Sequence, residues 1–258
     1  MEEILRKEFF YDIASADKIL IGIGEEFDTV LSAEGKKEAG CCKQFLKEKS
    51  RLDLLPAIEM LCRDKEDTKI IDGLAKLVKL IEDKDYYVVS TSTNSYIDSI
   101  KWKENRLVTP CGGSTYKQCP DCCEGSLTKL EDDDWAEIKK IKNHSTITEQ
   151  LGICKVCGQK LILNNIYAKK YDESSYLKDW QQYMTWLQRT INRKLMILEL
   201  GVGLQYPSVI RWPFEKVAFY NQKASFYRVN EKLYQLTPEL HDKGKTIAQN
   251  SIDWLASL

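Results

Sequence analysis

One stretch of the chain, residues 194–230, constrains the fold more than any other, because it contains a strand, a glycine turn, a helix and a second strand in succession. Residues 195–200 (LMILEL) form a short apolar run of strand length that ends abruptly at Gly201-Val202-Gly203. Apolar residues then recur at helical spacing after Pro207, and residues 224–229 return to an extended pattern. The stretch therefore predicts two parallel strands joined by a helix.

Glycines at the point where a strand meets a helix have a chemical use as well as a geometric one. They let the phosphates of a ligand approach backbone N–H groups, and the dipole of the helix end favours negative charge there. Gly201 and Gly203 are therefore candidate ligand-binding residues. The alternative is that these glycines only shape the turn.

Two further strands point to the same kind of sheet. Residues 19–24 (ILIGIG) form an apolar strand that ends in Gly22-Ile23-Gly24, as a first phosphate-binding turn does, although a third glycine is missing. Residues 86–91 (YYVVST) form a β-branched strand that leads into a polar turn containing Asn94. Because parallel sheets of this kind present ligand contacts at the carboxyl ends of their strands, Gly22, Gly24 and Asn94 are also candidates.

The cysteines indicate a metal site. Cys119-x-x-Cys122 and Cys154-x-x-Cys157 are two knuckles that can direct four thiolates at one tetrahedral ion, which predicts zinc. Cys123 leaves open which of two adjacent thiols is the ligand in the first knuckle. A closed site of four cysteines has no open position, so the zinc is expected to be structural. Three other cysteines lack the spacing of a ligand pair: Cys41, Cys42 and Cys62.

Composition excludes several classes of protein. The 258 residues suffice for one large domain and a small insert, and 38 basic residues nearly balance 39 acidic ones, so neither DNA nor RNA is an expected partner. No apolar run approaches the roughly 20 residues of a membrane-spanning helix. The first residues, MEEILRKEFFY, are too charged for a signal peptide. The nine cysteines, an odd number with adjacent pairs, fit a reducing compartment, and we expect a cytoplasmic protein without membrane attachment.

Strands ending in Gly or Asn, together with an inserted four-cysteine module, resemble the sirtuin family over about residues 15–235. The likeness is sharpest at residues 199–215 (ELGVGLQYPSVIRWPFE), which resemble the ELGVG, TP, IIR and PF signature of the class M sirtuins. The resemblance implies an α/β fold, with a Rossmann-like parallel sheet, helices on both faces and a small zinc-ribbon insert. It also implies an NAD-binding domain from residues 1–108 and 167–258, a zinc-binding insert at 109–166, and Asn230 as a contact of the adenosine ribose.

The chain departs from the sirtuin pattern at three places in its first half. Glu25-Glu26-Phe27-Asp28 replaces a serine-rich loop, which puts two carboxylates close to the expected pyrophosphate. The T-x-N-x-D motif keeps Asn94 but has Tyr96 instead of its Asp, and Cys111 stands in place of the catalytic histidine. The only histidines of the chain lie outside that motif: His144 and His241.

The missing histidine decides which activity the resemblance implies. In the family this residue is the general base on a ribose hydroxyl during deacylation, and class M sirtuins, which lack it, are ADP-ribosyltransferases. We therefore expect an NAD-dependent protein ADP-ribosyltransferase that releases nicotinamide, rather than a lysine deacetylase, with Asn94 and Cys111 as the catalytic positions. Two alternatives remain: NAD hydrolysis without a protein acceptor, and an inactive relative that binds NAD, ADP-ribose or a partner protein.

Overall fold

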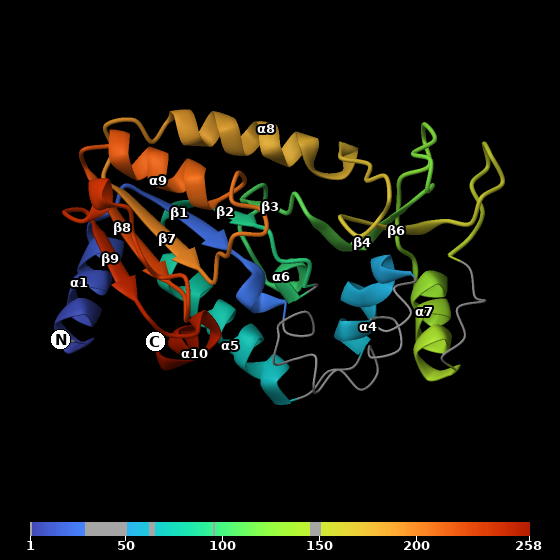
Figure 1. The fold of residues 1–258 in the computed structure, drawn as a ribbon, viewed down its shortest axis with the longest axis horizontal. Helices are drawn as coiled ribbons and strands as arrows, with labels where there is room; N and C mark the ends of the chain where they lie inside the picture. Colours follow the sequence, from blue (N-terminus) through green and yellow to red (C-terminus); the bar gives the residue numbers. More distant parts are fainter. Residues whose placement is uncertain (1, 29–50, 62–64, 95, 145–150) are drawn as a thin grey trace.

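The computed structural model describes residues 2–28, 51–61, 65–94, 96–144 and 151–258 (Figure 1). Its main element is a six-stranded, all-parallel sheet in the order β3-β2-β1-β7-β8-β9. The strands are β1 (Lys18–Ile23), β2 (Asp85–Ser90), β3 (Leu107–Val108), β7 (Leu195–Leu200), β8 (Ala224–Val229) and β9 (Gly244–Ile247).

Helices cover both faces of this sheet because its strands are apolar on both sides. α1 (Glu2–Ser15), α5 (Lys65–Ile81) and α10 (Ser251–Ser257) pack on the face that carries Ile19 and Ile21. α8 (Ser174–Gln188) and α9 (Arg211–Tyr220) pack on the opposite face, which carries Leu20 (Figure 1). Near-continuous apolar strands are what a parallel sheet buried on both faces requires.

A second, antiparallel sheet in the order β5-β4-β6 forms the other end of the molecule (Figure 1). Its strands are β4 (Gly112–Gln118), β5 (Thr128–Lys129) and β6 (Ile162–Asn165). α7 (Asp132–His144) and α4 (Leu55–Leu61) share a small core with Cys119 and Cys154. Short helical turns complete the fold: η1 (Glu25–Phe27), η2 (Leu52–Leu54), α6 (Tyr96–Ser99) and η3 (Pro238–Leu240).

The order of the strands fixes where a ligand can enter the large sheet. From β1 the chain continues to β2 on one side, and from β7 it continues to β8 on the other side. The crossover helices therefore leave β1 and β7 towards opposite faces, through α5 and α9 respectively. In open α/β sheets, ligands bind in the crevice that forms outside the carboxyl ends of two such strands. The turns after β1 and β7 border that crevice.

The expected α/β fold is confirmed, with a difference at one boundary. The helix after the Gly201–Gly203 turn begins at Arg211 rather than near Pro207. The segment at 124–151, between the two cysteine pairs, contains the 13 residues of α7. The division into residues 1–108 with 167–258 and an insert at 109–166 remains a proposal. No helix among the described residues has the length and apolarity needed to cross a membrane.

Candidate functional site

The carboxylate of Glu26, in the turn after β1, accepts hydrogen bonds from the backbone N–H groups of two distant segments. Its Oε2 accepts hydrogen bonds from the backbone N–H of Ser251 (2.9 Å) and from the Ser251 hydroxyl (2.6 Å). Its Oε1 accepts the N–H of Glu231 at 2.8 Å. Glu26 thus joins the end of β1 to the loop after β8 and to the start of α10.

Glu25 makes the corresponding contact with the turn after β7. Its Oε2 accepts the backbone N–H of Gly203 at 2.6 Å. A Cβ added to Gly203 would lie 3.0 Å from this oxygen, and a Cβ added to Gly201 would lie 2.5 Å from the Cβ of Glu26. The two predicted ligand-binding glycines therefore leave a space that the chain fills with its own glutamate side chains.

The glycines at the end of β1 have a packing role. A Cβ on Gly22 would lie 2.5 Å from a side-chain carbon of Ile210, just before α9. A Cβ on Gly24 would lie 2.3 Å from the Cα of Val202. Gly22 must lack a side chain for Ile210 to pack on β1, and Gly24 must lack one for the turns after β1 and β7 to approach each other. The sequence predicted the position of the turn after β1, and these close contacts explain why glycines occur there.

Asn94 and Asn230 also lie at the carboxyl edge of the large sheet, and both are buried. Asn94 donates from Nδ2 to the carbonyl of Phe27 (2.9 Å) and accepts the N–H of Tyr96 (2.9 Å). Asn230 donates to the carbonyl of Val202 (3.2 Å) and accepts the N–H of Lys232 (2.9 Å) and of Leu233 (2.7 Å). The fold thus brings together all six predicted cofactor-binding residues at one edge: Gly22, Gly24, Asn94, Gly201, Gly203 and Asn230.

Asp28 is an ionisable residue of this edge that the sequence did not single out. Its Oδ1 accepts hydrogen bonds from the Ser92 hydroxyl (2.7 Å), the Thr93 N–H (2.9 Å) and the Thr93 hydroxyl (3.4 Å). Burial, followed by the nearby carboxyls of Glu59 and Glu25, raises the pKa of Asp28 to about 8. Its only sequence signal was its place in the acidic turn after a strand that ends in glycines.

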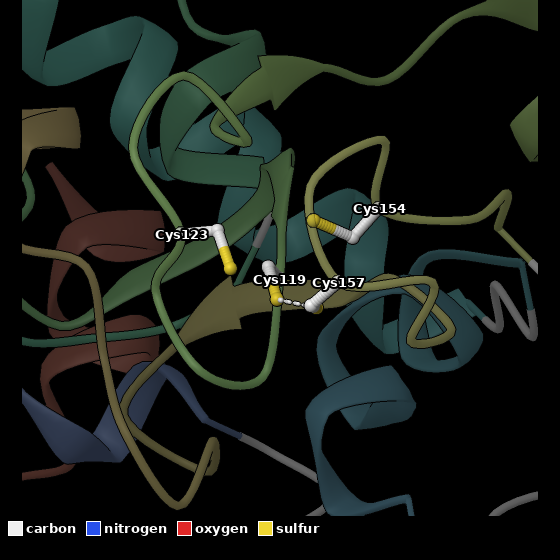
Figure 2. Close-up of side chains that lie close together, drawn as sticks. All are labelled: Cys119, Cys123, Cys154 and Cys157. Carbon is white, nitrogen blue, oxygen red and sulfur yellow. Dashed lines mark hydrogen bonds between the residues drawn. The ribbon is translucent and has the colours of Figure 1, made fainter.

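Four cysteines meet at the far end of the second sheet (Figure 2). The sulfur atoms of Cys119, Cys123, Cys154 and Cys157 all lie within 4.8 Å of one another, and those of Cys119 and Cys157 are 3.4 Å apart. Zinc–sulfur bonds of about 2.3 Å in tetrahedral geometry require such a set. These thiols can therefore hold one tetrahedral metal ion.

Of the two adjacent thiols between which the sequence left the choice open, the structure brings Cys123 rather than Cys122 to the other three cysteines. Cys122 adopts a left-handed backbone conformation (φ 53°) in a turn closed by its N–H on the carbonyl of Cys119 (2.9 Å). Its sulfur accepts from the side-chain amide of Gln118 at 3.6 Å, whereas the sulfur of Cys123 turns towards Cys119 (Figure 2). Of the cysteines without ligand spacing, Cys41, Cys42 and Cys62 lie outside the described residues.

The charged residues of the 199–215 signature form a buried network behind the Gly201–Gly203 turn. Arg228 donates to Glu199 (2.6 Å) and to Glu215 (2.7 Å), and its side chain is 1% exposed. Arg211 donates to the carbonyl of Val202 within that turn (3.1 Å). Because ion pairs desolvated in this way need fixed geometry, the network holds the turn in place.

Comparison with solved structures decides the fold. Nearly the whole chain, 97%, superposes on a Sir2–p53 peptide–NAD⁺ complex with a TM-score of 0.58, covering 95% of that chain at 13% identity. A Sir2 homolog–NAD complex gives a TM-score of 0.56 at 12% identity, over 97% of this chain and 91% of that one. The chain has the sirtuin fold. The resemblance seen at residues 199–215 is thereby confirmed at the level of structure.

Sequence comparison adds two curated relatives of this sirtuin-fold chain, and no family model matches it. A probable bifunctional ADP-ribose hydrolase/ADP-ribosyltransferase of Fusarium oxysporum f. sp. cubense is 28% identical over 138 residues. A protein ADP-ribosyltransferase of Staphylococcus aureus is 20% identical over 179 residues. The matches cover 51% and 69% of this chain, but only 23% and 57% of those relatives.

Cys111, which the sequence comparison puts at the position of the family's histidine, lies directly before β4. The thiol is 3% exposed. Burial raises the pKa of Cys111 above its ordinary value, and the nearby carboxyls of Asp28 and Glu25 raise it further. Tyr167 faces the same group of residues, with its hydroxyl 3.5 Å from that of Thr93. His241 is exposed beside η3, and nothing is described of the side chain of His144.

Proposed function

We propose that this chain uses NAD to transfer ADP-ribose to an acceptor, with release of nicotinamide, and that it does not deacylate lysine. The observation that carries the proposal is the state of Cys111, a buried thiol whose pKa is raised where a deacylase needs a base active near neutral pH. The names of the two curated relatives, both of which include ADP-ribosyltransferase, support the same activity. A protein acceptor is part of the proposal.

The donors at the sheet edge fit an anionic dinucleotide. The N–H groups of Gly203, Glu231 and Ser251 each hold a carboxylate oxygen, and backbone N–H groups that hold a carboxylate also suit phosphate oxygens. Gly201, Gly203 and Asn230 would hold the dinucleotide, with the Gly22–Gly24 turn beside them and Asn94 at the end nearer Cys111. When bound, NAD supplies the ADP-ribosyl group and the nicotinamide leaving group.

Asp28 is the residue that we assign to proton exchange in this cleft. The hydrogen bonds from Ser92 and Thr93 end on Oδ1, and we assign Oδ2 as the atom that takes or releases a proton. Its pKa of about 8 lies near the working pH of a cytoplasmic enzyme, as an acid or base catalyst requires. Cys111 stays a neutral thiol in the same range, because burial and the carboxyls of Asp28 and Glu25 raise its pKa.

We also propose that the four-cysteine cluster holds one structural zinc ion. The donor set of four thiolates matches tetrahedral zinc, and it leaves no position for water or substrate. The ion would then stabilise the second sheet without taking part in catalysis.

One observation favours a second candidate function, that of an inactive relative. Glu25 and Glu26 occupy the donors that a dinucleotide needs, and Asn94 and Asn230 use their amides to hold turns. In this alternative the chain acts as a sensor of ADP-ribose or as a binding partner of another protein.

Incubation of the purified chain with NAD separates these functions. We expect free nicotinamide, no deacetylation of an acetyl-lysine peptide, and a mass increase on an acceptor protein or, with water as the acceptor, free ADP-ribose. Cys111→His restores the base position, so deacetylation by this variant would show that the rest of the pocket is intact. Deacetylation by the unmodified chain would refute the proposal, and the absence of nicotinamide release would favour the inactive relative.

A further inference from the structure

We propose that Glu25 and Glu26 set the affinity of the cleft for anionic dinucleotides, because their carboxylates compete with the ligand's phosphates for the same backbone N–H groups. This inference rests on the proposed function, since it concerns the same cleft. It goes further by assigning a role to two residues at which the chain departs from the family motif.

The position of the contacts supports competition. The crevice between the carboxyl ends of β1 and β7 is where a parallel sheet of this order binds ligands. Glu25 and Glu26 follow β1 directly, and Gly201 and Gly203 follow β7. The contact from Glu25 to the Gly203 N–H therefore joins the turn after β1 to the turn after β7, beside glycines whose missing side chains would otherwise leave room for a ligand.

The number of donors also supports competition. Glu26 takes the N–H of Glu231, and both the N–H and the hydroxyl of Ser251, so both of its oxygens are engaged. A donated N–H cannot serve a phosphate at full strength while it serves a carboxylate, and the two anions repel each other across the crevice. The ligand can bind with all its contacts only after the carboxylates leave.

The two side chains can leave without unfolding the site. Glu25 and Glu26 are each only partly buried, and both are on a turn rather than within a strand. Displaced into solvent, the carboxylates would be hydrated and the pyrophosphate would take over their donors. The cleft therefore behaves as an anion site that holds two anions of its own.

The test compares the wild-type chain with the charge-neutral, same-shape variant Glu25→Gln/Glu26→Gln, and uses Glu104→Gln, an exposed glutamate outside the cleft, as the matched control. Calorimetric titration with ADP-ribose should show about tenfold tighter binding by the double variant and no change in the control. Glu26→Gln alone should give the larger share of the effect, because Glu26 holds more donors than Glu25. Inorganic pyrophosphate, used as a second probe, should follow the same order.

A readout that needs no turnover completes the test. In Glu26→Ala, the amide hydrogens of Glu231 and Ser251 should exchange faster with solvent, and ADP-ribose should protect them again. Equal or weaker binding by the double variant would overturn the inference, because the glutamates would then not compete with the ligand. If the double variant does not fold, the single Gln variants give the same comparison. Nicotinamide release by the wild-type chain tests the proposed function separately. If only the variants bind ADP-ribose tightly and no protein releases nicotinamide, the proposed enzymatic activity is refuted. The proposed competition between the glutamates and the ligand would still hold.

Discussion

The two ends of the molecule contain the two candidate binding sites, and these sites differ in the groups that form them. At the cysteine cluster the candidate ligand atoms are side-chain sulfurs, brought within 4.8 Å of one another. At the edge of the large sheet the donors are backbone N–H groups, and the chain's own carboxylates hold them. When side chains form a site, their chemical type indicates which ligand it binds. Backbone N–H groups can instead bind any anion, including a carboxylate of the same chain.

The largest effect that we predict is loss of the metal. Cys154→Ser should release the zinc and unfold the second sheet, since a structural zinc site contributes on the order of 10 kcal/mol in small modules. Cys122→Ser is the matched control, and should retain both the metal and the fold because Cys122 lies outside the cluster. Metal analysis and thermal melting of the three proteins test this. Folded protein without metal would contradict a structural metal site at the cysteine cluster. Metal loss in Cys122→Ser would contradict the assignment of Cys122 outside the cluster.

The second prediction concerns the space at the sheet edge. Gly201 has φ +63°, and a Cβ there would lie 2.5 Å from the Cβ of Glu26 and 2.7 Å from the Ser251 hydroxyl oxygen. Gly125 has φ +73° but no atom within 4 Å of such a Cβ. Gly125→Ala should therefore cost about 1–2 kcal/mol, from backbone strain alone. Gly201→Ala should cost about 1–3 kcal/mol more, from crowding.

Denaturant unfolding of the two alanine variants measures that difference. The combination Gly201→Ala/Glu26→Gly should recover part of the crowding cost, because it removes the Glu26 Cβ that would lie 2.5 Å from the new methyl group. It should not recover the strain of the positive φ. Equal costs at Gly125 and Gly201 would show that the glutamate does not fill this space.

The sequence predicts the cysteine cluster and the edge of the large sheet to different extents. Four strands of the large sheet, β1, β2, β7 and β8, were predicted to within one residue, because runs such as 195–200 must be apolar on both faces to be buried between two helical layers. The short strands β3 and β9 and the strands of the second sheet were not predicted. The cysteine cluster was predicted apart from the choice between Cys122 and Cys123, which the sequence left open. The exchange of Cys122 for Cys123 depends on a positive φ at Cys122, which nothing in a Cys-Cys pair specifies.

The sheet edge was located but not understood. The acidic turn was seen as a departure from the motif, yet the partners of Glu25 and Glu26 lie 178 to 225 residues further along the chain. No local pattern reveals that pairing, because it exists only once β1, β7 and α10 have met. Asp28 was missed for the same reason, since its burial and its neighbour Glu59 come from the tertiary fold.

The third prediction uses the pKa of Asp28. The folded-state pKa is about 8 and the unfolded value about 3.9, so the folded state binds more protons between these values and its stability falls as the pH rises. Asp28→Asn removes this loss of stability at high pH, because asparagine does not ionise. The variant should therefore gain stability over the wild-type chain at pH 9 and gain little at pH 4. The same melting-temperature difference at both pH values would contradict a buried, proton-holding Asp28.

The smallest effect separates the hydrogen bonds of Asp28 from its burial. The Ser92 hydroxyl donates to Asp28 at 2.7 Å and lowers its pKa against the larger effect of burial. Because a hydrogen bond to a charged acceptor contributes more than one to a neutral acceptor, by about 1 kcal/mol, Ser92→Ala should destabilise the chain more at pH 9 than at pH 5. The pH at which stability levels off should also move upward, since the charged carboxylate has lost a donor. Thr93→Ser, which keeps both the N–H and a hydroxyl beside Asp28, is the control and should leave that pH unchanged.

If Ser92→Ala costs the same at both pH values, the hydroxyl stabilises the turn through another contact, such as the Asn94 N–H that it accepts at 3.2 Å. Asp28 would then owe its pKa to burial and its carboxyl neighbours, with the Thr93 N–H as its main donor.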